Sequence, residues 1–214
     1  MDLTKDGLCV TTDLPIAIAI CVAHHARAPA SSPAFEAALA EVIAAAPPRE
    51  ADPMKAAVRT LLRHGKYKPT GRGKPASEYL WQSAVAGEFP RVFPLVDVCN
   101  LVSLRTLLPI SLVDLTRADT LSFCVRRGRA GESYVFNAGG QEIALEDLLL
   151  LARLPSDTPC ANAVKDSLAT KLTATSQDVL AVVYAPADQA ALAQRAATEM
   201  GDWFTRDFGA EVFF

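Results

Sequence analysis

Short apolar runs near the two ends of the chain constrain its fold more than any other feature. Residues 14–22 (LPIAIAICV) and 179–184 (VLAVVY) are short and rich in branched aliphatic residues, so each predicts a buried strand. Further strands are predicted in the second half, at residues 120–125, 132–136 and 141–145. A basic, glycine-containing turn at residues 126–131 joins the first two of these as in a hairpin, and the turn 137–140 (NAGG) precedes the third.

Helix signals are grouped in the first half of the chain. A serine followed by a proline (residues 32–33) can begin an alanine-rich helix, which two prolines (residues 47–48) end. Residues 52–53 (DP) repeat the start signal, and Gly65 is placed to cap the end of that second helix. Other helices are predicted at residues 76–86, 94–107 and 187–204. Early helices, with strands near both ends and in the middle, favour an α+β domain over a regular βαβ array.

Length and composition predict one domain over residues 1–214. Half of the 214 residues are hydrophobic, which is enough for one substantial core, and the sequence has no repeat or low-complexity linker. The N-terminus lacks the basic region and apolar run of a signal peptide, and the longest apolar run, residues 14–23, is too short to span a bilayer. We therefore expect a soluble, cytoplasmic protein that does not act at a membrane.

The cysteines and histidines do not predict a metal site. The five cysteines are scattered, no CxxC pair is present, and no histidine lies at ligand spacing from two of them. The adjacent pair His24-His25 follows a strand directly, so the two side chains should point to opposite sides. We expect reduced, buried thiols and no metal or other cofactor.

One stretch is strongly basic although the chain carries a net charge of only −3. No acidic residue occurs between Asp52 and Glu78, an interval that holds seven lysines and arginines and the glycine-containing loop 66–74. Cations and accessible backbone N–H groups suit phosphate, and an aromatic side chain can stack on a base. The predicted RNA or phosphate contacts are Arg63, Lys66, Tyr67, Lys68, Arg72, Lys74 and, from a second basic cluster at 126–129, Arg127. The alternative is a solvated helix face that continues into an ordinary polar loop.

Other polar residues are candidates for a substrate site. Five of them lie together between two elements of structure: Lys165, Asp166, Ser167, Thr170 and Lys171. A carboxylate there could hold an α-ammonium group and the hydroxyls could orient a water, or Asp166 could bond to backbone in a capped loop. Asp97 and Asn100, at i and i+3, could face a pocket or fasten a neighbouring loop. Glu132 could pair with Arg127 or Arg129 or face a ligand, and Asn137 could serve its turn or a ligand.

Several segments in the middle of the chain carry a recognisable set of motifs. These are residues 89–104 (FPRVFPLVDVCNLVSL), 108–114 (LPISLVD), and 131–136 (GESYVF) with 140–143 (GQEI). They resemble the B3/B4 family, which includes the editing module of the bacterial phenylalanyl-tRNA synthetase beta chain. Stand-alone members of that family are similar at residues 62–72, 75–80, 164–167 and 170–171. The resemblance spans residues 59–186.

The resemblance implies an α+β fold with a β-sandwich-like centre flanked by helices. It also implies hydrolysis of a mischarged aminoacyl ester at the tRNA 3′ end, which needs an amino-acid pocket, a positioned water, oxyanion donors and cations for the phosphates. The catalytic candidates are Asp166, Ser167, Ser111 and Thr170, and the substrate-binding candidates are Lys165, Lys171, Asp97, Asn100, Glu132 and Asn137. Ser111 stands where the family has its editing histidine, Phe93 replaces an asparagine, and residues 164–167 replace a Gly-Gly pocket loop.

Three functions stay open from the sequence. The first is a trans-acting editing hydrolase, an aminoacyl-tRNA deacylase, and the second is a non-catalytic RNA- or tRNA-binding module. The third is a binder of, or enzyme acting on, a free amino acid or a small derivative. The expected partners are tRNA or aminoacyl-tRNA, with an amino-acid-like ligand as the alternative and no DNA.

Overall fold

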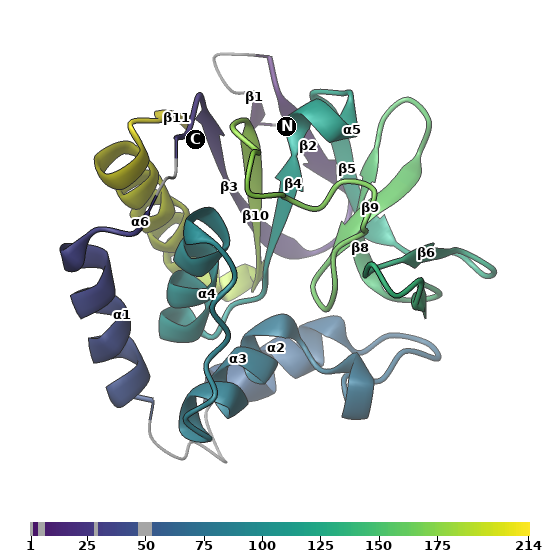
Figure 1. Cartoon of the computed structure of the whole chain (residues 1–214). Helices are drawn as coiled ribbons and strands as arrows, with labels where there is room; N and C mark the ends of the chain where they lie inside the picture. Colours follow the sequence, from purple (N-terminus) through teal and green to yellow (C-terminus); the bar gives the residue numbers. More distant parts are fainter. Residues whose placement is uncertain (1, 4–6, 28–29, 47–52) are drawn as a thin grey trace.

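The computed structural model describes residues 2–3, 7–27, 30–46 and 53–214, and Figure 1 shows sheets at its centre with helices around them. An antiparallel sheet pairs the two apolar runs from opposite ends of the sequence, with Cys21 opposite Ala181. Its strands, in sheet order, are β11 (Glu211–Phe213), β3 (Ile16–His24), β10 (Val179–Pro186) and β4 (Ile110–Asp114). Both predicted end strands are therefore confirmed as neighbours in one sheet.

A second sheet contains five strands, and its outer strand β9 contacts β4, the outer strand of the first sheet. In sheet order its strands are β1 (Asp2–Leu3), β2 (Cys9–Thr12), β5 (Ser122–Arg127), β8 (Leu149–Arg153) and β9 (Thr158–Asn162). Among the described strands of this sheet, β2 and β5 pair in parallel and the other neighbours are antiparallel. The two sheets share one hydrophobic cluster, which includes Val22 and Val182 from the first and Phe123 and Leu151 from the second.

Helices cover one face of the first sheet and flank the basic loop 66–74 in the sequence. They are α1 (Pro33–Ala44), α2 (Pro53–Leu62), α3 (Ala76–Val85), α4 (Pro94–Thr106), α5 (Leu115–Ala118) and α6 (Ala190–Phe208), with short 3₁₀ turns at Gly71–Gly73 and Ala187–Gln189. Helices α1, α4 and α6 lie on one side of the four-stranded sheet, and α6 contacts β3 and β10 (Figure 1). The predicted α+β class is confirmed. Among the described residues no helix is both long and apolar enough to cross a bilayer.

The start of α1 confirms the predicted signal, whereas the end of α2 corrects one. The Ser32 hydroxyl accepts a hydrogen bond from the Phe35 N–H at 3.1 Å, with Pro33 in the first turn. Gly65 has a left-handed φ of +46°, but it lies three residues past the end of α2, in the turn closed by His64 and Tyr67, so the predicted glycine cap is wrong. The Arg127 guanidinium instead donates to the terminal carbonyls of α2. The two prolines after α1, and Asp52, lie outside the described residues.

The predicted hairpin between residues 120–125 and 132–136 is also wrong. Strand β5 lies between β2 and β8, while β6 (Ser133–Val135) pairs with β7 (Glu142–Ala144) in a separate two-stranded sheet. The run 149–153 (LLLAR), which the sequence analysis did not assign, supplies the real partner of β5. It has four buried residues in succession and no alternation, so its period gave no strand signal. The strands predicted at residues 132–136 and 141–145 are confirmed as β6 and β7, which pair with each other across the NAGG turn.

Candidate functional site

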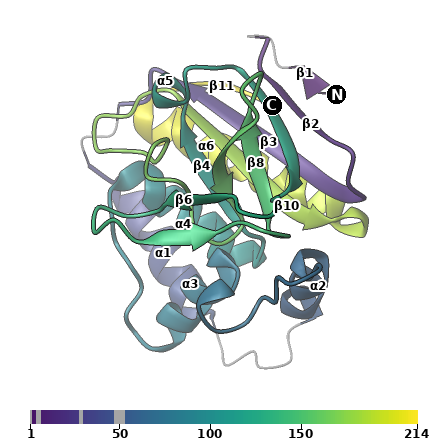
Figure 2. The ribbon, with the colours of Figure 1, turned by 90° about the vertical axis from the view of Figure 1, so that its right-hand side faces the viewer.

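Two neighbouring cavities lie where the loop 66–74 meets the β6–β7 hairpin and the segment 163–171. The outer cavity, between the loop and β7, has a volume of about 910 Å³. The inner cavity, bounded by α3, α4 and the segment 163–171, has a volume of about 600 Å³. Arg72, Phe136 and Lys165 line both cavities, so the two form one cleft. In Figure 2 the β6–β7 hairpin lies above α3, on the side that faces the viewer. Both volumes suit a ligand of at least nucleotide size.

Four cations surround the inner cavity: Arg72, Lys74, Lys165 and Lys171. The hydrogen-bond and ring contacts of the three lysines are to neutral groups, although Lys171 also interacts electrostatically with the Asp166 carboxylate. The Lys171 ammonium donates to the Phe136 carbonyl at 2.7 Å, the Lys74 ammonium donates to the Gln82 side-chain oxygen at 3.2 Å, and the Lys165 ammonium lies 4.1 Å from the Phe136 ring centroid. No aspartate or glutamate occurs among the described residues that line this cavity. The wall therefore carries a concentrated positive charge that favours an anion.

Aromatic and amide side chains complete the inner cavity. Tyr79, on α3, is 63% exposed, and Phe136 forms the wall shared with the outer cavity. Asn100, Asn137 and Gln82 add amide groups to the lining. Asn137 also fulfils its predicted turn role, because its oxygen accepts from the Gln141 N–H at 3.1 Å. The lining therefore combines cations, a stacking surface and hydrogen-bonding groups.

The outer cavity has a mixed charge. Lys66 forms an ion pair of 2.8 Å with Glu146, and its N–H donates to Asp147 at 2.7 Å. The Tyr67 hydroxyl donates to the Gly73 carbonyl at 2.5 Å, which braces the loop, and burial raises the pKa of Tyr67 to about 12. Lys68 is exposed and forms no ion pair among the described residues. The predicted basic loop therefore lines the cleft, but part of its charge is neutralised.

Three of the four predicted catalytic side chains are buried and line neither cavity. The Ser111 hydroxyl donates to the Asn162 carbonyl at 3.1 Å and accepts from the Tyr184 hydroxyl at 3.2 Å. The Thr170 hydroxyl donates to the Cys160 carbonyl at 2.7 Å, and the Ser167 hydroxyl accepts from the Ala169 N–H at 3.3 Å. These hydroxyls connect β4, β9 and the segment 163–171, so their contacts are internal to the protein.

Asp166 also bonds to backbone rather than to either cavity. Its two carboxylate oxygens accept from the Leu112 N–H at 3.1 Å and from the Asn162 N–H at 3.2 Å. Part of the residue is exposed, but the carboxylate lies among enough protein atoms that desolvation raises its pKa to about 6, against the opposing effect of these hydrogen bonds. The arrangement is the capped-loop alternative recognised from the sequence.

A comparison with protein families decides what kind of domain this cleft belongs to. The family described as the B3/4 domain matches residues 71–210, most of the chain. The chain belongs to the B3/4 domain family. B3/4 domains as a family are associated with tRNA binding and editing, and the matched region of this chain contains all four inner-cavity cations. The match begins later and ends later than the predicted span of residues 59–186. A search of curated proteins found no match to the chain.

Two predicted ligand-binding residues have structural partners in this B3/4 domain. Glu132 forms a two-pronged ion pair with Arg126, at 2.7 and 2.9 Å, and accepts from the Arg129 N–H, so the predicted pairing with the Arg127 or Arg129 side chain is wrong. The Arg127 guanidinium donates to the carbonyls of Leu61 and Leu62, at 2.8 and 3.1 Å. These carbonyls end α2 and have no helical partner, so Arg127 caps the helix and is not placed for phosphate.

Asp97 and Asn100, one helical turn apart on α4, have different surroundings. Asp97 is buried and accepts from the Arg91 guanidinium at 2.8 Å and from the Val92 N–H at 2.9 Å. It therefore fastens the loop that precedes α4, which was the alternative recognised from the sequence, and it lines neither cavity. Asn100 is partly exposed and lines the inner cavity. Arg63 is exposed and lies outside both cavities.

Replacing Asp97 with alanine should destabilise the B3/4 domain without changing its cleft. We expect the free energy of unfolding to fall by about 2 kcal/mol, because the Val92 N–H and the Arg91 guanidinium lose a buried acceptor. Urea denaturation followed by circular dichroism measures this. Asn100→Ala is the control, because Asn100 lies on the same helix but is partly exposed. Its substitution should change the free energy of unfolding little. Equal stability of the Asp97 variant and the wild-type protein would contradict the structural role.

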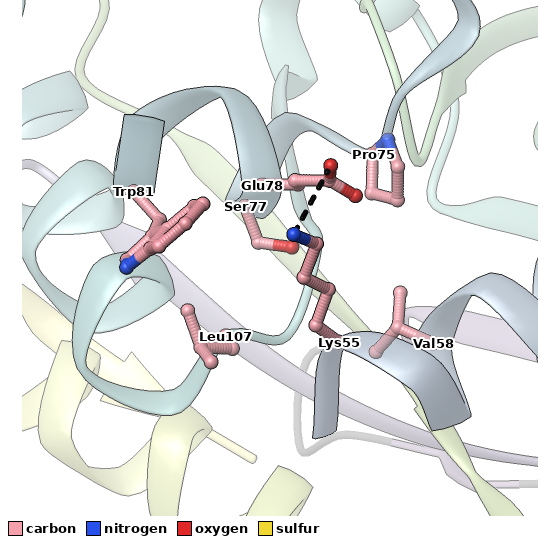
Figure 3. A pocket seen from close by; sticks show the side chains of 7 residues that line it. All are labelled: Lys55, Val58, Pro75, Ser77, Glu78, Trp81 and Leu107. Carbon is pink, nitrogen blue, oxygen red and sulfur yellow. Dashed lines mark ion pairs between the residues drawn. The ribbon is translucent and has the colours of Figure 1, made fainter. Parts of the chain in front are cut away.

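Glu78 forms ion pairs with two more cations of the basic stretch, Arg59 and Lys55. It is buried and forms a two-pronged ion pair with Arg59, at 2.5 and 2.8 Å, while Lys55 lies 3.8 Å away. Figure 3 shows Lys55 pointing at Glu78, with Trp81 and Leu107 on the other side of a small pocket. The space there is about 10 Å³, room for one water at most, so it is no ligand site. Among the described residues no group of three or more metal-ligating side chains is found.

Sequence reasoning missed Tyr79, Gln82 and Phe136 as cleft residues. Helix α3 buries Leu80, Trp81 and Ala84, which leaves Tyr79 on the opposite, solvent-facing side. An aromatic residue away from the buried face of an amphipathic helix is a signal that could have been read from the sequence. Phe136 gave no such signal, because it directly follows β6 and the partner predicted for that strand was wrong.

Proposed function

We propose that this B3/4 domain is a cytoplasmic RNA-binding module and that its inner cavity receives unpaired nucleotides of a tRNA. The observation that carries the proposal is the set of four cations around an aromatic-walled cavity that no carboxylate lines. Phosphates would contact Arg72, Lys74, Lys165 and Lys171. A base would stack on the exposed ring of Tyr79, because stacking is available to any base and needs only an accessible aromatic face.

Binding is better supported than hydrolysis. General base catalysis needs a group within hydrogen-bond reach of the attacking water, and the inner-cavity lining has neither an imidazole nor a carboxylate. Ser111, Ser167 and Thr170 are buried in internal hydrogen bonds. We therefore propose the non-catalytic binding role as the main function. Ester hydrolysis above the uncatalysed rate in a panel of mischarged tRNAs would favour the editing role instead.

The proposal predicts that RNA affinity falls with salt and that single-stranded RNA binds more tightly than duplex RNA. Four phosphate contacts to a single strand give a slope of about −2.8 for the logarithm of affinity against the logarithm of salt concentration. Fluorescence anisotropy with tRNA, a short single-stranded RNA and a blunt RNA duplex measures both the slope and the preference. We expect the tRNA and the single strand to bind more tightly than the duplex. No binding at low salt, or a duplex bound equally well, would contradict the proposal.

A further inference from the structure

We infer that Asp166 is a positioning residue whose ionised carboxylate clamps the segment 162–171 to β4 and so sets the places of Lys165 and Lys171 in the inner cavity. Gain of a proton by this carboxylate would loosen the clamp and weaken RNA binding. The inference rests on the proposed function for its effect on RNA, but the clamp itself can be tested without RNA.

The clamp joins two different elements. Strand β4 is the outer strand of its sheet, and its Leu112 N–H donates to one oxygen of Asp166, while the N–H of Asn162, the last residue of β9, donates to the other. An ionised carboxylate accepts on both oxygens. A protonated carboxyl has a hydroxyl in place of one acceptor, so one of these two backbone N–H groups loses a full partner.

Asn162 carries the constraint onward to Lys165. Its side-chain oxygen accepts from the N–H groups of Val164 and Lys165, both at 2.7 Å, and its amide nitrogen donates to the Tyr134 hydroxyl. That hydroxyl donates to the Lys165 carbonyl at 2.7 Å. The backbone of Lys165 is thus held on both sides by groups that Asp166 and Asn162 position. Its side chain extends from this fixed point over Phe136.

The other end of the segment is held by different contacts. The Arg117 guanidinium donates to the carbonyls of Lys171 and Leu168, at 2.8 and 2.9 Å, and the Leu168 N–H donates to the Val135 carbonyl at 2.8 Å. Lys171 also lies close enough to Asp166 to favour its ionised form. Protonation of Asp166 should therefore release the part of the segment near Lys165 first, while the Arg117 contacts remain.

Asp166 is the group in this cluster that titrates near neutral pH. The titratable side chains that interact with it from neighbouring elements are Cys99 on α4, Tyr134 on β6, Cys160 on β9 and Tyr184 on β10. Burial raises the pKa of all four, so they stay neutral between about pH 5 and 8. Desolvation brings the pKa of Asp166 to about 6, so its charge changes within that range.

A fall in pH should change the stability of the fold and the affinity for RNA in opposite directions. The folded-state pKa of Asp166, about 6, lies above its ordinary value of 3.8, so this group favours the folded state most at low pH. That contribution is lost as the pH rises through the interval between the two values. RNA affinity should change in the opposite direction and fall as the pH drops through about 6. If Asp166 had only a structural role, RNA affinity and stability would not change in opposite directions as the pH drops through about 6.

The test compares Asp166→Asn with the wild-type protein and with Asp157→Asn. Asp157 carries the same charge, pairs with Arg126 and Arg129, and lines neither cavity, so its variant is a matched control. At about pH 7.5 we expect Asp166→Asn to bind single-stranded RNA about tenfold more weakly, the cost of roughly one lost charge-assisted hydrogen bond. Wild-type affinity should fall towards that of the variant by about pH 5, whereas the Asp166→Asn profile should be flatter than that of Asp157→Asn.

Hydrogen–deuterium exchange supplies the second measurement. Amides of residues 163–166 should exchange faster in Asp166→Asn than in Asp157→Asn, and the β10 amides should exchange equally in both. Unchanged exchange in these amides, or RNA affinity equal to that of the wild-type protein at about pH 7.5, would overturn the inference. If the wild-type protein binds no RNA, the proposed function fails, and the exchange experiment still decides whether Asp166 holds the segment.

Discussion

Replacing the four inner-cavity cations with glutamine (R72Q/K74Q/K165Q/K171Q) should weaken binding of single-stranded RNA about 600-fold at about 0.1 M salt. The figure follows from the expected slope, because four contacts at about 0.7 each lose nearly three powers of ten in affinity between 0.1 M and 1 M salt. Without these cations the slope should approach zero, and the affinities of the variant and the wild-type protein should converge near 1 M salt. Fluorescence anisotropy across a salt series measures both quantities.

A control variant must remove the same charge from elsewhere on the surface. Arg27, Arg129, Arg195 and Arg206 are not in the lining of either cavity, so R27Q/R129Q/R195Q/R206Q lowers the net charge equally and leaves the cleft intact. We expect this control to retain most of the affinity and the slope of the wild-type protein. Equal losses in the two variants would mean that RNA follows overall charge rather than the inner cavity, and this would contradict the proposed site.

Gly128→Ala should destabilise the fold by about 3 kcal/mol, the upper end of the usual cost of overpacking. A β-carbon at Gly128 would lie 1.8 Å from the carbonyl oxygen and 2.6 Å from the carbonyl carbon of Leu145. These atoms belong to the backbone, and Gly128 exchanges hydrogen bonds with Asp147 and Leu148 in the same turn, both at 2.8 Å. The turn therefore cannot move away without loss of those bonds.

Thermal denaturation measures the effect of this substitution. For a chain of this size, 3 kcal/mol lowers the Tm by about 10 °C. Gly139→Ala is the matched control, because the nearest atom to a β-carbon there is the Asn137 side-chain oxygen at an ordinary 3.5 Å. We expect its Tm to stay close to that of the wild-type protein. A Gly128 variant as stable as the Gly139 variant would show that the close approach of Gly128 to the Leu145 backbone does not constrain the fold.

Much of the secondary structure followed from local signals. Ser32 caps α1 as predicted, Pro94 opens α4, and the apolar runs at both ends of the chain form β3 and β10. These signals depend on neighbours within a few residues, so one sequence is sufficient to read them. The strand partners did not follow. Strand β8 has no alternation, and the pairing of β5 with β8 joins segments more than twenty residues apart.

The sequence also revealed only part of the candidate site. The basic loop lines the cleft, and Lys165, Lys171, Asn100 and Asn137 line the inner cavity with it. The net charge of the basic stretch between Asp52 and Glu78 could not be predicted, because Glu78 neutralises Arg59 and Glu146 neutralises Lys66. Residue type alone could not show whether Ser111, Ser167 and Thr170 are structural or catalytic, since a buried structural serine and a catalytic serine look alike in a sequence.

The sequence by itself therefore determined the α+β class, the end strands, the helix starts and the position of a basic loop, because backbone propensity, capping and hydrophobic periodicity act over short spans. Only the tertiary structure decided which cations stay without a carboxylate partner and which polar groups are buried. Ion pairing and desolvation depend on side chains that are distant in sequence and close in space. For this reason the motifs were enough to indicate the family, while only the tertiary structure showed that Ser111 is buried and that the Asp166 carboxylate accepts from backbone N–H groups.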